Sequence, residues 1–215
     1  MASNDTTQLN SAPIHRTRVS RGKVVVFLGP DGAGKSTILN LLQAELNTRG
    51  SEFAFRYFAP GFLKRYRPKG DNCVTTNPHE GRQYGPALIF AKLSLMLFEF
   101  HMGLPRLRQR HRLILFDRYI HDILVDPRRY RMEILRGWMR WMLKAAPKPD
   151  LLVIISAPAD MIQARKQEVP PEETFRQVAA YEALADILPN TVIIRNDTSP
   201  EAAAAAALIR LEALT

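Results

Sequence analysis

The sequence predicts a three-layer α/β fold, with a parallel sheet of about five strands and helices on both faces. Two observations support this prediction. Short apolar runs alternate with helical patterns along the chain, and a glycine-rich loop joins the first apolar run to the first helix. Apolar strands that alternate with helices are typical of a parallel sheet covered on both sides. The chain has 215 residues, enough for one domain with a full core.

Each element is expected from its local pattern. Buried strands are expected at 23–28, 53–58, 113–117, 151–155 and 191–194. Helices are expected from the glycine-rich loop to about residue 49, and at 87–100, 130–144, 159–168, 172–186 and 201–214. Gly103 and Pro105 are expected to break the apolar helix at 87–100. Ser199 has the residue type of an N-cap, and Pro200 suits the first turn that follows it.

The glycine-rich loop is a complete phosphate-binding motif. Residues 29–37 read Gly-Pro-Asp-Gly-Ala-Gly-Lys-Ser-Thr, with a strand before them and a helix after them. Backbone N–H groups at such a helix start can hold triphosphate oxygens. Lys35 is expected to reach the β- and γ-phosphates, and Ser36 to bind Mg²⁺. The motif predicts a P-loop NTPase fold that binds ATP with Mg²⁺. The expected nucleotide-binding residues are Gly29, Asp31, Gly32, Ala33, Gly34, Lys35, Ser36 and Thr37.

A second candidate group follows the strand at 113–117. Asp117 ends this strand, and ligands of parallel sheets bind at the carboxyl ends of strands. An acidic residue there can hold Mg²⁺ directly or through water, or can cap a turn. Arg118 could bind a substrate phosphate through two hydrogen bonds, or could form a surface ion pair. Tyr119 is placed with Arg118 in the expected acceptor site.

The phosphate loop followed by Asp117-Arg118-Tyr119 resembles the thymidylate kinase family. The segment Val153-Ile154-Ile155-Ser156-Ala157-Pro158-Ala159, with Ala164-Arg165-Lys166 after it, resembles the strand and helix that enter the lid of that family. Phe175-Arg176-Gln177-Val178 with Tyr181 resembles the helix after the lid. The resemblance covers about residues 21–210 and implies phosphoryl transfer from ATP.

The resemblance also implies roles for single residues. Asp31 matches an acid that contacts a sugar hydroxyl of the acceptor, and Asp117 an acid beside Mg²⁺ and the acceptor. Arg118 matches the arginine that grips the acceptor phosphate. Gly32 stands where some members carry an arginine, and members with glycine there place a catalytic basic residue in the lid. The candidates for this residue, in or beside a short lid at about 165–172, are Arg165, Lys166 and Arg176, with Arg165 our first choice.

The acceptor is left open, because parts of the family pattern are missing. The stretch 57–62 lacks the Arg-Glu-Pro-Gly-Gly segment of thymidylate kinases, and the following helix lacks their arginine and glutamine. Arg128 and Arg129, in the loop 122–131, are candidate acceptor-binding residues within a broader acceptor region at about 59–131. A nucleoside monophosphate and a non-nucleotide hydroxyl, such as one on a sugar or glycan intermediate, both remain. A nucleotide-binding switch without an acceptor is the third possibility.

Composition sets the broader expectations. The formal charge of +9 favours anionic partners, but no nucleic-acid fold signature accompanies the basic run at 106–112. The single cysteine, Cys73, permits no internal disulfide and suits a reducing, cytoplasmic compartment. Residues 1–20 are expected to form a disordered tail, followed by one kinase domain at 21–215. His121 is expected to be structural rather than a general base.

The apolar segment at 87–100 is expected to be a buried helix. It is too short to span a bilayer and carries Lys92 and Glu99. The same helix could serve a homodimer interface.

Overall fold

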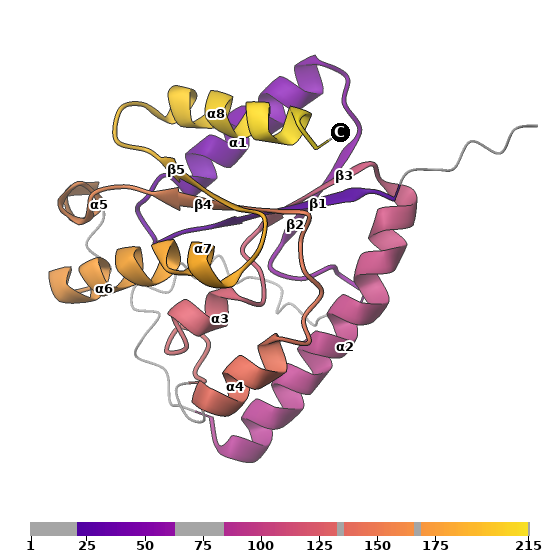
Figure 1. Cartoon of the computed structure of the whole chain (residues 1–215), viewed down its shortest axis with the longest axis vertical. Coiled ribbons are helices and arrows are strands. Elements are labelled where there is room, and N and C mark those ends of the chain that lie inside the picture. The colour runs from indigo at the N-terminus through magenta and orange to yellow at the C-terminus, as the bar shows by residue number, and fades with distance from the viewer. Residues whose placement is uncertain (1–20, 63–83, 133–135, 166–168, 215) are drawn as a thin grey trace, which may run out of the picture.

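The computed structural model describes residues 21–62, 84–132, 136–165 and 169–214. Its five strands form one fully parallel sheet in the order β2-β3-β1-β4-β5. The expected α/β three-layer fold is confirmed (Figure 1). The strands are β1 (Lys23–Leu28), β2 (Phe53–Tyr57), β3 (Leu113–Asp117), β4 (Leu151–Ser156) and β5 (Thr191–Arg195).

Helices cover both faces of the sheet (Figure 1). On one face lie α1 (Lys35–Thr48) and α8 (Pro200–Glu212). The other face carries α2 (Pro86–Arg110), α3 (Asp122–Val125), α4 (Arg136–Leu143), α6 (Pro171–Glu182) and α7 (Leu184–Ile187). The short α5 (Ala159–Arg165) follows β4. The side chain of Ser199 accepts a hydrogen bond from the backbone N–H of Ala202 at 3.1 Å, so the expected N-cap of α8 is confirmed.

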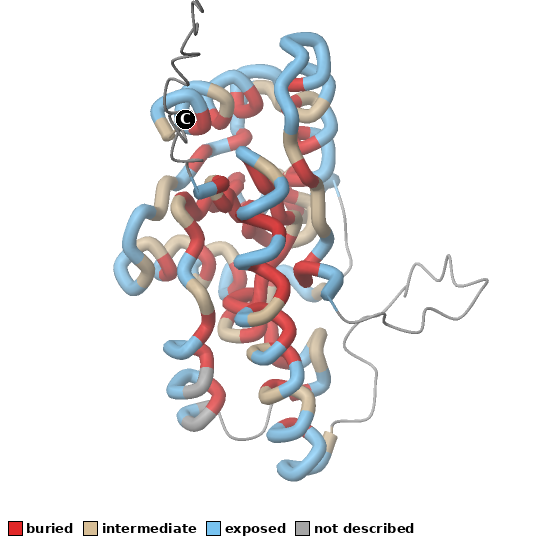
Figure 2. The backbone as a smooth tube through the Cα atoms, turned by 90° about the vertical axis from the view of Figure 1, so that its right-hand side faces the viewer, coloured by how far each residue is buried: buried red, intermediate tan, exposed pale blue. Residues whose placement is uncertain are grey.

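The central strand β1 divides the core into two clusters. Val24, Val26 and Leu28 pack toward α2, whereas Val25 and Phe27 pack toward α1. Alternate residues of a strand point to opposite faces, so a strand that is apolar throughout is needed to fill both layers. Figure 2 shows the buried residues concentrated in the interior, with exposed residues on the outer turns of the helices.

Strand register sets the position of the site. Phe27 of β1 pairs with Asp117 of β3, so the loop after β1 begins beside the carboxylate that ends β3. β1 itself lies between β3 and β4. β2 and β3 lie on one side of β1 and β4 and β5 on the other, so the order in which strands are added switches sides at β1. Open α/β sheets bind ligands outside the carboxyl ends of the strands at such a point.

The expectation that Gly103 and Pro105 break the apolar helix is wrong. α2 continues through both residues to Arg110. Leu104 and Leu107 are buried on the same face as the preceding apolar residues, and this packing offsets the backbone hydrogen bond that Pro105 cannot make. Gly103 is required for a close approach, because a Cβ there would overlap the side chains of Pro60 and Phe62.

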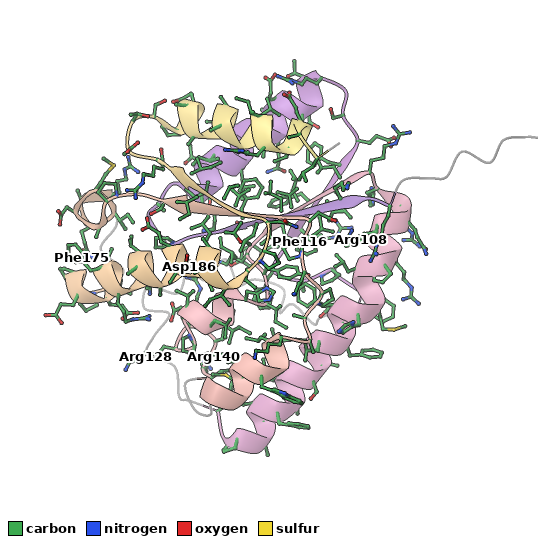
Figure 3. The ribbon with its side chains drawn as sticks, in the orientation of Figure 1. Arg108, Phe116, Arg128, Arg140, Phe175 and Asp186 are labelled. Atoms are coloured by element: carbon green, nitrogen blue, oxygen red, sulfur yellow. The ribbon has the colours of Figure 1, made fainter. Side chains whose placement is uncertain are left out.

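The basic run therefore lies largely on the last turns of α2, and one of its arginines is structural. Arg108 is buried, donates to the carbonyl oxygen of Gly22 at 3.1 Å and pairs with Asp150 at 2.8 Å (labelled in Figure 3). Asp150 also accepts from the backbone N–H of Val24. Arg108 thus joins α2 to the starts of β1 and β4 and is not available to a nucleic acid.

One side of α2 carries exposed apolar residues. Leu88, Leu95 and Phe98 are 46%, 55% and 51% exposed, whereas Ile89, Leu93 and Phe100 are fully buried. Among the described helices, α2 alone has the length and hydropathy of a membrane-crossing helix. The core helix of a soluble protein passes the same test, and the other side of α2 packs on the sheet.

Some expectations fall on residues that the structure does not describe. They are the tail at 1–20, Cys73 with most of the stretch at 59–86, and Lys166 in the lid.

Candidate active site

The phosphate loop has the backbone that its glycines permit. Gly29, Gly32 and Gly34 have φ angles of 150°, 88° and 86°, which side chains disfavour. A Cβ on Gly29 would also overlap the carbonyl oxygen of Ile155 in β4. The loop thus lies directly against the neighbouring strand and then begins α1 at Lys35.

Asn196, which follows the edge strand β5, holds this loop in place. It follows β5 and is 1% exposed, and its side-chain Nδ2 donates to the carbonyl oxygen of Ala33 at 2.8 Å. Its own N–H donates to the carbonyl oxygen of Ser156 at 2.8 Å. A Cβ on Gly34 would overlap Nδ2, so the third glycine of the motif makes room for this amide. Sequence analysis did not identify Asn196.

Lys35 and Asp117 face each other at the centre of the site. Lys35 is 6% exposed, and its Nζ lies 3.9 Å from Oδ1 of Asp117. Burial lowers the pKa of Lys35, and the charge of Arg118 lowers it further. Burial raises the pKa of Asp117, although Lys35 and Arg118 oppose that shift. Both shifts disfavour the charged forms. A phosphate beside Lys35 and a cation beside Asp117 would restore them.

The residues present fit Mg²⁺. Oδ1 of Asp117 is buried and has no hydrogen-bond partner among the described residues. A metal ion bound there would satisfy this oxygen. Ser36 is exposed at the first turn of α1. Mg²⁺ at such sites is held by one or two protein oxygens, waters and the nucleotide phosphates. It therefore needs no cluster of three acidic or histidine side chains, and the described residues contain none.

Arg118 turns back into the site because its backbone is left-handed. Its φ angle is 69°, and its N–H donates to the carbonyl oxygen of Phe27 at 3.0 Å. The side chain is 4% exposed and donates through Nη1 to Oδ2 of Asp122 at 2.6 Å and through Nη2 to Asp31. A left-handed arginine costs backbone energy, and two carboxylates hold it in place.

Asp31 joins the phosphate loop to this arginine and to a second one. Nη2 of Arg118 donates to one of its oxygens, and Nη1 of Arg129 donates to the other. Burial alone would raise the pKa of Asp31, but the charges of Arg118, Arg129 and Lys35 lower it well below its usual value. Asp31 therefore stays ionised. We call the group formed by Asp31, Arg118, Asp122 and Arg129 the clasp.

Asp122 is the most enclosed member of the clasp. It has no exposed surface and accepts hydrogen bonds from Tyr130 at 2.6 Å and from Tyr181 of α6, in addition to Arg118. Burial raises the pKa of both tyrosines, and the charge of Asp122 raises it further. Both hydroxyls therefore remain protonated donors. Four segments meet at this carboxylate, namely the end of β3 through Arg118, α3 through Asp122 itself, the segment after α3 through Tyr130, and α6 through Tyr181.

Known structures share this fold. The thymidylate kinase of Candida albicans superposes with a TM-score of 0.61 at 18% sequence identity, covering 90% of this chain and 92% of that chain. The protein has a divergent thymidylate kinase-like P-loop fold. The Candida albicans enzyme is described as having broad substrate specificity and a novel structural element. At this identity the likeness carries the fold and not the acceptor.

A protein-family model described as ABC transporter matches residues 15–56. This match spans less than half of the chain and centres on β1, the phosphate loop and α1. These elements occur in many nucleotide-binding proteins, so the match supports the P-loop and nothing more specific. No curated protein sequence matches the chain.

The thymidylate kinase-like fold brings one of the two candidate acceptor arginines into the site. Arg129 reaches Asp31, and its backbone N–H donates to Oδ1 of Asp126 at 3.1 Å. Arg128 is exposed and lies on the α3 side of the sheet (Figure 3). The turn after α3 therefore directs the two neighbouring arginines differently.

The three basic residues considered for the lid also differ in position. Arg165, at the end of α5, is exposed. Arg176 of α6 donates through Nη2 to the carbonyl oxygen of Val125 at 3.0 Å and also pairs with Glu173. Arg176 thus ties α6 to α3, next to the clasp. Lys166 lies outside the described residues.

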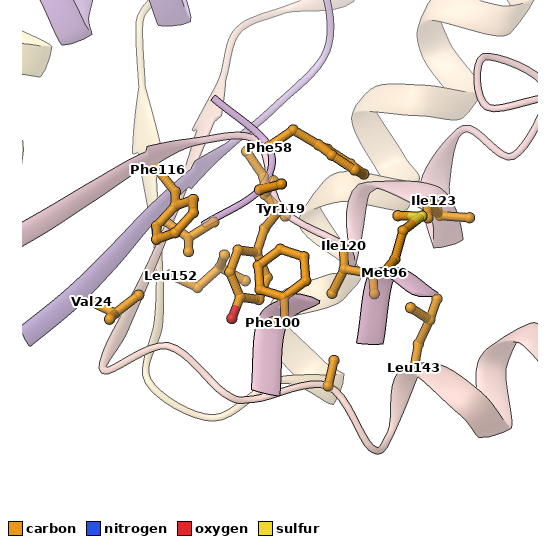
Figure 4. Packing of buried hydrophobic residues seen from close by; sticks show 14 of the residues in the cluster. Val24, Phe58, Met96, Phe100, Phe116, Tyr119, Ile120, Ile123, Leu143 and Leu152 are labelled. Atoms are coloured by element: carbon orange, nitrogen blue, oxygen red, sulfur yellow. The ribbon is translucent and has the colours of Figure 1, made fainter. Parts of the chain in front are cut away.

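Tyr119 does not join the site. The structure places it fully buried in the core, in edge contact with Phe100 and Phe116, and its hydroxyl donates to the carbonyl oxygen of Pro147 at 2.7 Å (Figure 4). The ring belongs to the same core cluster as Phe100 and Phe116. We therefore leave Tyr119 out of the acceptor site, for which sequence analysis had proposed it.

His121 stacks on Tyr119 with ring centroids 5.6 Å apart and is 3% exposed. Burial lowers its pKa to about 4, and the charge of Lys148 adds to this. His121 lies in the core beside Tyr119, a position that suits the structural role expected for it.

Sequence analysis missed Tyr130 and Asn196, and it assigned no role in the site to Tyr181. No local signal identifies them, because each acts through a partner that is distant in the sequence or held by a turn. Asp122 was noted only as an acid in the acceptor loop. Its spacing of four residues from Arg118 is the one feature that could have suggested an ion pair.

Proposed function

We propose that this protein is a P-loop kinase that transfers the γ-phosphate of ATP to a small acceptor bound at the clasp. One observation carries this proposal. The phosphate loop is linked by Asp31 to two arginines that come from outside the loop, Arg118 and Arg129. A protein that only binds and hydrolyses nucleotide needs the loop and its Mg²⁺ ligands. An arginine and carboxylate cluster beside the γ-phosphate position suits a second substrate.

The chain's own residues account for the nucleotide side of the reaction. Loop N–H groups and the start of α1 hold the phosphates, and Lys35 neutralises charge on the transferring phosphoryl group. Ser36 and Asp117 would hold Mg²⁺, which when bound neutralises the β- and γ-phosphate oxygens. Catalysis of this kind depends mainly on position and charge. The buried, closely spaced Lys35 and Asp117 suit that requirement.

The acceptor side depends on the clasp. Arg118 and Asp31 would orient the acceptor hydroxyl toward the γ-phosphate, and Arg129 would close over it. Asp31, whose pKa is lowered by the neighbouring arginines, stays ionised and can accept a hydrogen bond from that hydroxyl. A lid formed by α5, α6 and their connection would exclude water, with Arg165, Lys166 or Arg176 adding positive charge. Arg176 is supported most directly, because it already contacts α3.

Two acceptor classes remain within this proposal. A nucleoside monophosphate is the acceptor implied by resemblance to thymidylate kinases. A non-nucleotide hydroxyl on a sugar or glycan intermediate is the alternative. We further propose a cytoplasmic location and, through the exposed side of α2, a homodimer.

The deciding experiment measures ADP release from ATP–Mg²⁺ with a panel of nucleoside monophosphates, sugars and sugar phosphates. We expect at least one acceptor to raise the rate of ADP release well above the rate measured without an acceptor. Lys35→Ala should abolish that stimulation while the circular dichroism spectrum stays that of the wild type. Lys23→Ala, also in the β1 region but outside the loop, is the matched control. Full activity in Lys35→Ala would show that this loop is not the phosphate site.

A further inference from the structure

The arginines of the clasp are already matched by carboxylates. Arg118 donates from one terminal nitrogen to Asp122 and from the other to Asp31. Arg129 occupies the second oxygen of Asp31. Two guanidinium groups therefore face two carboxylates, and the formal charge of the clasp is zero. A phosphate-binding site, in contrast, usually carries an excess of positive charge to match its ligand.

Asp122 is a fixed partner of Arg118. It has no exposed surface, and Tyr130 and Tyr181 both donate to it. If Asp122 turned away from Arg118, two tyrosine hydroxyls and a guanidinium would be left buried without an acceptor. The tyrosines come from the segment after α3 and from α6, so packing of these elements holds the carboxylate in place.

Asp31 is the partner that faces the reaction. It lies in the phosphate loop and is part-buried rather than enclosed. Displacing it by a phosphate would separate it from both arginines at once. A phosphate bound beside Asp31 instead would bring at least one further negative charge to a site whose two arginines are already balanced by Asp31 and Asp122. The geometry disfavours both arrangements.

We propose that the group of the acceptor that binds at the clasp is an uncharged polyol, such as the hydroxyl face of a sugar, and not a phosphate ester. This inference rests on the proposed function and names its acceptor class. Hydroxyl groups can donate to Asp31 and accept from Arg129 without displacing either one. Paired carboxylates and arginines around a polyol satisfy both hydrogen-bonding roles of each hydroxyl.

The reaction that follows is balanced with ATP as the only co-substrate. One acceptor hydroxyl oxygen forms a bond to the γ-phosphorus, and the bond from that phosphorus to the β–γ bridging oxygen breaks. ADP leaves with the electron pair of that bond. The hydroxyl proton is released to solvent. The product is a phosphate monoester of the polyol.

The direct test is binding of inorganic phosphate at the clasp. The protein is first saturated with the β,γ-imido analogue of ATP and Mg²⁺, which occupies the phosphate loop up to the γ position. Inorganic phosphate is then titrated by calorimetry. We expect no saturable binding to the wild type. Asp31→Asn and Asp122→Asn each remove one negative charge, and we expect both variants to gain saturable phosphate binding, with a Kd at least about tenfold below the highest phosphate concentration at which the wild type shows no binding.

Each outcome of this titration decides the point. Saturable phosphate binding to the wild type at the clasp would overturn the inference. So would a failure of both variants to gain binding, since charge would then not be what excludes phosphate. If Asp122→Asn does not fold, the part-buried Asp31→Asn carries the test alone. Glu201→Gln, an exposed charge removal at the start of α8, should bind no phosphate.

Turnover separates this inference from the proposed function. ADP release is compared for matched pairs, glucose with glucose 6-phosphate and thymidine with thymidylate. We expect the unphosphorylated member of a pair to have the higher kcat/KM by at least about tenfold. A preference for the phosphorylated member would overturn the acceptor class and leave the kinase proposal intact. The kinase proposal would be contradicted if the ATP analogue did not bind, or if no compound of a broad acceptor panel stimulated ADP release. The phosphate titration would still decide whether the charge of the clasp excludes phosphate.

Discussion

Nδ2 of Asn196 donates to the carbonyl oxygen of Ala33 at 2.8 Å, so a residue beyond the last strand holds the phosphate loop near the start of the chain. The two residues are 163 positions apart. The loop must keep several N–H groups pointed at one ligand, and a buried amide on its far side restricts its movement.

Removal of the Asn196 amide should loosen the loop. Asn196→Ala leaves the Ala33 carbonyl buried without its partner, at a cost of about 1–3 kcal/mol in the free energy of unfolding. We expect a higher KM for ATP with a smaller change in kcat. Urea denaturation and ATP-dependent kinetics measure the two effects, with the exposed Asn40→Ala as control. An unchanged KM for ATP would mean that Asn196 supports only stability.

Arg118 should affect the acceptor more than ATP. Arg118→Lys keeps the charge but cannot span Asp31 and Asp122 together. Loss of one charge-assisted hydrogen bond predicts a fall in kcat/KM for the acceptor of about tenfold to a hundredfold. The KM for ATP should stay within about twofold of the wild type.

The control for this variant is Arg110→Lys, an exposed residue at the end of α2. It should leave both substrates unaffected. Equal losses for ATP and acceptor in Arg118→Lys would place this arginine outside the acceptor site.

Stability should fall in mild acid because His121 is buried in its neutral form. Its pKa is lowered to about 4, whereas the unfolded chain takes up a proton near the ordinary value of 6.5. The unfolded state therefore binds more protons between these values, and the free energy of unfolding falls as the pH falls. A shift of this size predicts a loss of about 2 kcal/mol between about pH 7 and pH 5.

His121→Asn removes this titration. The difference in unfolding free energy between wild type and variant, measured by urea denaturation at each pH, should shrink as the pH falls from about 7 to about 5. A difference that stays constant with pH would show that the pKa of His121 is the same in the folded and the unfolded chain.

The exposed apolar side of α2 should support a homodimer. Leu95 and Phe98 are each about half exposed, and burying such side chains against a second copy would remove them from water. Light scattering after gel filtration should give twice the mass of 24.4 kDa at micromolar concentration. Leu95→Glu should shift the protein to monomer. Phe90→Glu, exposed elsewhere on α2, should leave the mass unchanged, and a monomeric wild type would refute the interface.

Local sequence patterns determined much of this protein. Fully apolar runs predicted the parallel strands, the motif around Lys35 predicted the phosphate loop, and Ser199 predicted the start of α8. In each case the signal lies within a few neighbouring residues, because strand burial, loop conformation and helix capping are local requirements. The position of Asp117 beside the loop also followed, since carboxyl ends of parallel strands meet at one edge of the sheet.

Only the tertiary structure decided what depends on packing between distant segments. Pro105 lies within α2, because burial of Leu104 and Leu107 outweighs one missing hydrogen bond. Tyr119 belongs to the core rather than to the site, although it directly follows Arg118. The clasp brings together the phosphate loop, the end of β3, α3 and the segment after α3, and its charge balance exists only when these four segments pack together. Residue types alone could place arginines near a phosphate, but their pairing with buried carboxylates is a property of the folded chain.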